Sequence, residues 1–285
     1  MRIGLVVDAT CDLPPEFLAA HGIRVMPIGI RLGEQRLIDR RDPDTTLSFY
    51  RDHLPKVGSK DGSQPLSAAE LQQWFLDELV TDFDYVVCLT VDSLRSPIFE
   101  HATQASFGLL QHYHERRHAA GIAGPFTLRV LDSHSVFAGI ACLAAEGTRL
   151  LAQGSHPNAL RTRLEQLSQQ TCTYLVADDL GHLRRRGFQK GDRSGFVDRV
   201  KGAALGLGSL LDVKPVFSLA DGEDKPSYAG DPTALRDLPG FAALENACRE
   251  RDIHLHLGML SPTGGINLGA GAMSLGFIAT PKAFA

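Results

Sequence analysis

The sequence contains no C-x-x-C pair, and its five cysteines are scattered along the whole chain. An odd and scattered set does not suit a disulfide framework, so we expect free, buried thiols in a reducing compartment. No apolar run approaches the roughly 20 residues that span a bilayer, and the first apolar run ends at Asp8, too soon for a signal peptide. These absences predict a cytoplasmic protein without stable membrane insertion.

Several signatures of catalysis and cofactor binding are missing as well. The chain has neither a G-x-S-x-G elbow nor a G-x-x-x-x-G-K-[ST] loop, and GGINLGAG at 264–271 departs from the dinucleotide spacing G-x-G-x-x-G. His114 and His118 share a predicted helix face, but such a pair is more often solvated than metal-bound. A net charge of −4 gives no general attraction to nucleic acid. We therefore predict no cofactor, no metal and no nucleic-acid partner.

What the sequence does contain is an alternation of strand-like and helix-like stretches, which predicts an α/β fold. YVVCLT at 85–90 is continuously apolar, as expected of a central parallel strand, and Ser67-x-x-Glu70 is a capping box that opens an amphipathic helix. AQGSHP at 152–157 suggests a boundary, so we expect two α/β domains, 1–157 and 158–285, with a ligand cleft between them. We also expect strands at 24–30, 126–132, 253–259 and 274–279, a helix at 97–118 and a loop at 261–271.

Polar residues follow three of the predicted strands where each one ends. They are Asp8 to Asp12, Thr90 to Ser96, and Asp132 to His134. In open α/β sheets, ligands bind at the carboxyl ends of the strands, so these segments predict a common polar rim. The alternative is that the aspartates only cap the helices that follow.

Two loops are further candidates for binding. GSKDGSQP at 58–65 offers Ser63 and several backbone N–H groups at the predicted start of a helix, which would suit an anion, although an ordinary connecting loop is the alternative. The basic run Arg184–Arg186 could dock an acidic partner, although a solvated loop is the commoner outcome.

Seven short motifs follow one another along the chain: DATCDLP at 8–14, GSQP at 62–65, SPI at 96–98, VLDS at 130–133, LGHLRRRGF at 180–188, GSLLDVKPV at 208–216 and NLGAG at 267–271. In this order they resemble the DegV family of bacterial lipid-binding proteins, some of which are acyl-carrier subunits of fatty acid kinases. The resemblance implies two α/β domains, with an acyl chain buried between them and its carboxylate held at the cleft mouth by polar side chains.

The resemblance assigns the head group to Ser63, Ser96 and Asn267, with Asp8, Thr10 and Gly269 completing the rim. The chain departs from the family pattern at four motifs. Asn267 stands in place of a histidine, Gly62 in place of a threonine, Pro97-Ile98 in place of a glycine and a hydroxyl residue, and Phe188 in place of an arginine. Asn267 can donate hydrogen bonds but carries no charge, so it would hold a carboxylate less firmly than a histidine would.

We therefore predict a monomeric, non-enzymatic protein that binds a long-chain fatty acid or related lipid. The resemblance also implies that it presents the carboxyl group to a fatty acid kinase subunit. Two alternatives stay open: a hydrolase or phosphotransferase that uses Asp8 and Asp132, and a regulatory adaptor that acts through the basic loop Arg184–Arg186.

Overall fold

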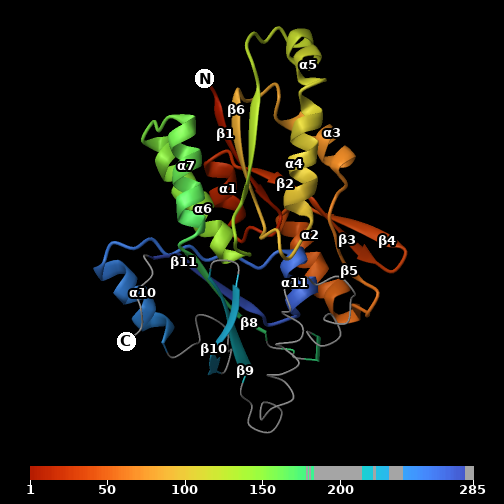
Figure 1. The fold of residues 1–285 in the computed structure, drawn as a ribbon. Helices are drawn as coiled ribbons and strands as arrows, with labels where there is room; N and C mark the ends of the chain where they lie inside the picture. The colour runs from red at the N-terminus through yellow and green to blue at the C-terminus, as the bar shows by residue number, and fades with distance from the viewer. Residues whose placement is uncertain (178, 180, 183–213, 221–222, 231–239, 280–285) are drawn as a thin grey trace.

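The computed structural model of the protein describes residues 1–177, 179, 181–182, 214–220, 223–230 and 240–279. Its first sheet is parallel, in the order β2 (Arg24–Met26), β1 (Ile3–Asp8), β6 (Tyr85–Thr90) and β7 (Thr127–Asp132). Helices α3 (Ala68–Glu78) and α4 (Ile98–Leu109) pack together on one side of this sheet, and α6 (Ala138–Ala152) and α7 (Pro157–Ser168) lie on the other (Figure 1). The predicted α/β fold is confirmed.

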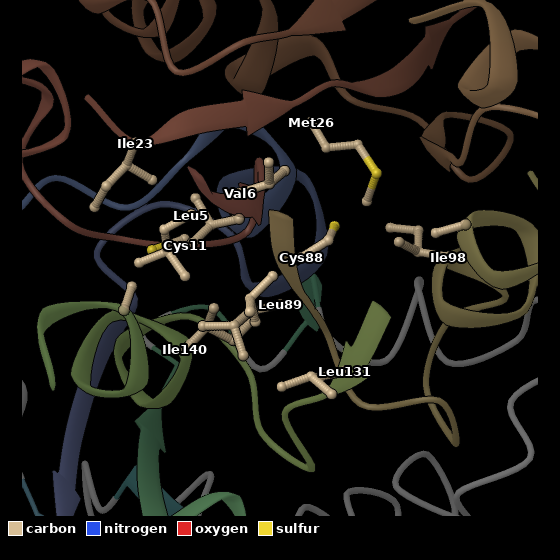
Figure 2. Close-up of a cluster of buried hydrophobic side chains, with 14 of the residues drawn as sticks. Leu5, Val6, Cys11, Ile23, Met26, Cys88, Leu89, Ile98, Leu131 and Ile140 are labelled. Carbon is tan, nitrogen blue, oxygen red and sulfur yellow. The ribbon is translucent and has the colours of Figure 1, made fainter. Parts of the chain in front are cut away.

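The main core lies between this parallel sheet and the helices that cover it. Leu5, Val6, Cys88 and Leu89 of β1 and β6 are almost entirely buried, because helices cover both faces of the two strands. Figure 2 shows Leu89 next to Ile140 of α6, with other residues of the cluster around the two strands. Continuous burial is the reason that both strands read as unbroken apolar runs.

A small antiparallel sheet lies beside the first one, in the order β4 (Gln35–Asp39), β3 (Ile28–Leu32) and β5 (Gly62–Gln64). The single strand expected at 24–30 is therefore two strands, β2 and β3, which are interrupted at Pro27, where the chain has no backbone N–H to donate. Helix α2 (Pro43–Ser48), a π-helical turn (Phe49–His53) and a 3-10 turn (Leu54–Lys56) connect β4 to β5.

The second large sheet is antiparallel, in the order β10 (Glu223–Gly230), β9 (Lys214–Ala220), β8 (Thr171–Val176) and β11 (Met273–Ile278). Helix α6 packs against β11 and β8 as well as against β1, so it contacts both large sheets. The contact with β11 is close at Gly276, where a Cβ atom would lie 2.3 Å from the carbonyl oxygen of Ala138. Only glycine fits there, and the side chain of Ser274 accepts the Ala138 N–H at 3.2 Å.

Three sequence expectations were wrong. Residues 253–259 form no strand and pair with no strand among the described residues; they lie beside α1 (Pro15–Ala20), where Phe17 contacts His256. The loop expected at 261–271 contains the helix α11 (Pro262–Leu268). The helix expected at 97–118 is two helices, α4 and α5 (Tyr113–Ala119).

Some other expectations are confirmed, and some fall outside the described residues. All five cysteines are free thiols, as predicted, but only Cys11 and Cys88 are buried, and the other three are half-buried. None of the described helices, including α10 (Phe241–Glu250), is long and apolar enough to cross a bilayer. The LGHLRRRGF motif lies mostly outside the described residues, as do the basic loop Arg184–Arg186, Phe188 and residues 208–213.

Candidate functional site

Two of the predicted head-group residues meet in the structure, although they are far apart in the sequence. The side-chain amide of Asn267 in α11 donates to the Ser63 hydroxyl in β5 at 3.4 Å, and it also donates to the Thr263 carbonyl at 2.8 Å. A carbonyl can only accept, which fixes the orientation of the amide, with Nδ2 toward Thr263. Ser63 is exposed and Asn267 is half-buried, so the pair lies at the surface.

The position of Ser63 differs from the prediction in one respect. It lies in β5, opposite Ile30 of β3, and not at the start of a helix. The neighbouring Gly62, which replaces a threonine of the family pattern, is buried opposite Arg31 in the same pairing. The strand therefore holds Ser63 on a regular element, with its hydroxyl toward α11.

Helix α11 is short and begins with strong local signals. The Ser261 side chain accepts the N–H of Gly264 at 2.9 Å, and Pro262 occupies the first turn, where its missing N–H costs nothing. Gly265 allows a close approach, because a Cβ atom there would lie 2.7 Å from the Tyr50 hydroxyl. Gly269 ends the helix with a φ of 92°, a conformation that favours glycine, and the His182 ring lies behind it.

Asp8 and Thr10 also lie together, but they are buried away from solvent. The Asp8 carboxylate accepts the backbone N–H and the hydroxyl of Thr10 and, at 2.6 Å, the N–H of Val91 at the end of β6. Burial raises the pKa of Asp8 above its ordinary value. These bonds join the ends of β1 and β6. Helix α1 begins at Pro15, and the residue that caps it is Pro14, so Asp8 does not act as a helix cap.

Asp12, at the other end of the DATCDLP motif, contacts the start of α11 directly. Its carboxylate accepts the N–H of Ser261 at 3.1 Å and lies 3.6 Å from the guanidinium of Arg41. Burial raises the pKa of Asp12 to about 7. The motif therefore contacts the start of the helix that carries Asn267. The position of the motif in the sequence did not indicate this contact.

Ser96 lies in the turn after β6, and no contact between described residues joins it to Ser63 or Asn267. It is half-buried, and its hydroxyl is 3.4 Å from the N–H of Ile98 at the start of α4. Ile98, which stands where the family pattern has a hydroxyl residue, is buried in the main core (Figure 2). Ile98 thus replaces a hydroxyl position of the pattern by a packing contact, whereas Pro97, which stands in place of a glycine, is exposed.

A separate polar group lies at the ends of β6 and β7. Asp92, Asp132 and His134 place possible metal-ligating atoms within 4.8 Å of one another, the one such group among the described residues. The Asp132 carboxylate already accepts the backbone N–H groups of Ser93 and His134, and Arg95 Nε lies 3.5 Å from Asp92. These donors, which include the positively charged guanidinium of Arg95, stabilise the two acids. Asp132 therefore belongs to a different group from Asp8.

A cavity of about 190 Å³ lies elsewhere, between α4, α5 and β7. Phe107, Leu110, Tyr113 and Leu128 are among its lining residues, and none of the predicted site residues contributes to it. The sequence did not indicate four residues that contact α11 or the segment just before it, since each one acts on a partner remote in the chain. They are Asp39, Arg41, Tyr50 and His182.

These features define an α/β protein in which a parallel and an antiparallel sheet share helix α6, and in which segments from both halves meet at a polar rim. Residues 2–230 match the model of the DegV family, which is described as a family of uncharacterised proteins. A DegV domain-containing protein of Xanthomonas axonopodis pv. citri (strain 306) is 41% identical over 318 residues, covering 100% of this chain and 99% of that protein. The chain belongs to the DegV family.

Solved structures share the fold at low sequence identity. A DegV lipid-binding protein from Thermotoga maritima aligns with a TM-score of 0.72 and 18% identity, covering 97% of this chain and 98% of that one. A stearic acid-binding protein from Eubacterium ventriosum ATCC 27560 aligns with a TM-score of 0.71 and 19% identity, covering 96% and 97%. A Thermus thermophilus DegV family protein, described as binding fatty acid, gives 0.69 and 19%, covering 98% and 100%.

Proposed function

We propose that this protein binds a long-chain fatty acid or related lipid without transforming it, and that Ser63 and Asn267 hold the head group. The observation that carries this proposal is the meeting of Ser63 and Asn267, which stand at two polar motifs that the chain shares in part with DegV proteins. One proton of the Asn267 amide goes to Thr263 and the other faces Ser63. The Ser63 hydroxyl can therefore accept from Asn267 while it donates its own proton to a ligand.

An apolar tail would supply most of the affinity. Burying a methylene group contributes about 0.8 kcal/mol, so ~14 of them contribute roughly 11 kcal/mol against an association cost of 4–15 kcal/mol. Fatty acids named for the solved DegV structures have such tails, for example the stearic acid of the Eubacterium ventriosum protein. A ligand of this kind would bind usefully even with the uncharged head-group contact of Asn267.

The same proposal includes the arrangement of the whole chain. We take residues 1–157 and 158–285 as two α/β domains with the acyl chain between them, in a cytoplasmic monomer that presents the carboxyl group to a kinase subunit. Thr10, Asp8, Ser96 and Gly269 would complete the rim around the head group. Asp8 as a catalytic nucleophile is less favoured, because its carboxylate is fully buried and accepts three hydrogen bonds.

The first test is the lipid content of the purified protein. Denaturing the protein and analysing the extract by mass spectrometry should reveal a fatty acid or related lipid in near-stoichiometric amount. A protein that is empty and also binds no long-chain fatty acid in a calorimetric titration would contradict the proposal. Turnover of an ester or phosphate substrate would favour the hydrolase or phosphotransferase alternative instead.

The Ser63→Ala variant tests the head-group contact. We expect fatty acid binding to weaken by about 0.5–3 kcal/mol, the range for losing a neutral or charge-assisted hydrogen bond. Thermal stability should change little, because Ser63 is exposed. Titration of both proteins with the same fatty acid measures the first effect and thermal unfolding the second. Unchanged affinity together with reduced stability would assign Ser63 a purely structural role.

Asn267→His tests the charge of the head group. An imidazole adds positive charge once it is protonated, so this variant should bind an ionised fatty acid more tightly, most visibly below about pH 6.5. Asn267→Leu should bind it more weakly, because the amide that donates to the Ser63 hydroxyl and orients it is lost. Affinities for the fatty acid and its methyl ester should be measured for wild type and both variants. Equal affinities throughout would show that Asn267 does not touch the head group.

A further inference from the structure

Four side chains from the first 50 residues hold the segment that leads into α11. Arg41 donates to the Met259 carbonyl at 2.9 Å, and Tyr50 donates to the Leu260 carbonyl at 3.1 Å. The Asp12 carboxylate accepts the Ser261 N–H at 3.1 Å. The Asp39 carboxylate accepts both the N–H and the hydroxyl of Thr263, at 2.9 and 2.7 Å. Four of the five backbone positions from Met259 to Thr263 are thus held by side chains that lie more than 200 residues earlier in the chain.

Arg41 adopts an unusual conformation to make these contacts. Its φ is 61°, in the left-handed region that few residues other than glycine occupy, and the Asp39 carboxylate accepts its backbone N–H at 3.0 Å. Arg41 is only 5% exposed. Its guanidinium donates both to the Met259 carbonyl and, at 3.1 Å, to the Leu13 carbonyl. A left-handed backbone and a buried charge each cost free energy, so the surrounding contacts must offset both.

Because Asn267 lies in α11, the contacts that fix the start of α11 also fix the position of Asn267. A helix of seven residues is too short to be stable by itself, so its position depends on external contacts. Thr263, which Asp39 binds, lies one helical turn before Asn267 and accepts a hydrogen bond from its amide. The contact between Asn267 and Ser63 is 3.4 Å, near the upper limit for a hydrogen bond, so a small displacement of the first turn would break it.

We propose that Arg41, together with Asp39, is a positioning residue that sets where α11 presents Asn267 to Ser63 and thereby the selectivity for the lipid head group. The part of this inference that concerns the ligand rests on the proposed function. The part that concerns the position of Asn267 does not, and it can be tested in the free protein.

Arg117 provides a matched control. It is the other deeply buried arginine among the described residues, at 2% exposure, and it likewise donates to backbone carbonyls, those of Val80, Phe83 and Gly124 among them. It lies in α5, at the opposite end of the first sheet from α11 (Figure 1). Arg41→Lys and Arg117→Lys therefore remove the same guanidinium from two equally buried sites, of which only one contacts the α11 segment.

The first measurement is the side-chain amide resonance of Asn267 in free protein labelled with ¹⁵N-asparagine. The chain has three asparagines, and the exposed Asn158 and Asn246 serve as internal references. We expect Arg41→Lys to shift the Asn267 signal and leave the two references in place, and Arg117→Lys to shift none of the three. An unchanged Asn267 signal in folded Arg41→Lys would overturn the inference, and Asp39→Asn gives a second, independent variant should the first fail to fold.

The second measurement compares the affinities for palmitate and methyl palmitate. In Arg41→Lys we expect the preference for the free acid over the ester to fall about tenfold, equivalent to one charge-assisted hydrogen bond. In Arg117→Lys this ratio should stay as in wild type. Equal weakening of both ligands by Arg41→Lys would indicate a general structural effect and would contradict the selectivity role. If wild type binds neither ligand, the proposed function fails, while the amide resonance still decides whether Arg41 positions Asn267.

Discussion

Replacing Arg117 by methionine is expected to lower the free energy of unfolding by about 3–5 kcal/mol, the range for breaking a buried ion pair from one side. The guanidinium is 2% exposed and donates to the carbonyls of Val80, Phe83, Ala123 and Gly124 and to the Asp84 carboxylate. These bonds tie the loop before β6 and the loop before β7 to α5. Methionine fills the volume but satisfies none of the acceptors.

The neighbouring Arg116 offers a control within the same helix. Its side chain is about half exposed and makes one surface ion pair, with Asp77 at 2.8 Å. Such pairs contribute roughly 0–1 kcal/mol, so Arg116→Met should have a small effect. Urea unfolding of wild type and the two variants measures the difference. Similar losses for Arg116→Met and Arg117→Met would show that helix charge, and not the buried hydrogen bonds, accounts for the effect.

The second large effect is a stability that falls as the pH rises. Burial raises the pKa of Asp12 to about 7, whereas the unfolded chain has the ordinary value of 3.8. Between these two values the folded protein retains a proton that the unfolded chain has lost, so the free energy of unfolding decreases as the pH rises from about 4 to about 7 and is level above that. A difference of about 3 pH units corresponds to about 4 kcal/mol. The pKa values of the buried Asp8 and Asp39 are also raised by burial and act in the same direction.

Asp12→Asn isolates this contribution. The free energy of unfolding should be measured by urea at pH 5 and pH 8 for wild type and variant, because subtraction removes groups that the two proteins share. One of these is His256, whose pKa is lowered by burial and which therefore opposes the trend below about pH 6.5. We expect the wild type to lose more stability than Asp12→Asn between pH 5 and pH 8. An equal loss in both proteins would show that Asp12 keeps an ordinary pKa in the folded state.

The central strands could be predicted from the sequence because their surroundings are uniform. Helices cover both faces of β1 and β6, so the two strands are unbroken apolar runs, and the capping box of Ser67 and Glu70 is present as expected, with the Ser67 N–H donating to Glu70 at 2.8 Å. Helix α11 was missed because its glycines obscured the Ser-Pro start signal. The alternating apolar residues of 253–259 predicted a strand, but alternation gives no information about whether a partner strand exists.

The candidate site divides in the same way. Sequence motifs predicted that Ser63 and Asn267 bind the head group. The structure brings the two residues together, although their role stays a prediction. No local pattern could have indicated Arg41, since its side chain contacts Leu13 and Met259, which lie 28 and 218 residues away in the chain. Residues that act through remote partners leave no periodicity to detect in a single sequence.

The pairing of β8 with β11 has a consequence for how the chain folds. Thr171 pairs with Ile278 and Val176 with Met273, so this ladder joins segments about 100 residues apart, whereas all strands of the parallel sheet lie within residues 3–132. Closing long loops costs entropy before any contact forms, which slows the formation of distant pairings. During synthesis the parallel sheet can therefore form well before the antiparallel one. The contact of Asn267 with Ser63 joins residues 204 positions apart, so it too can form only long after the parallel sheet has been synthesised.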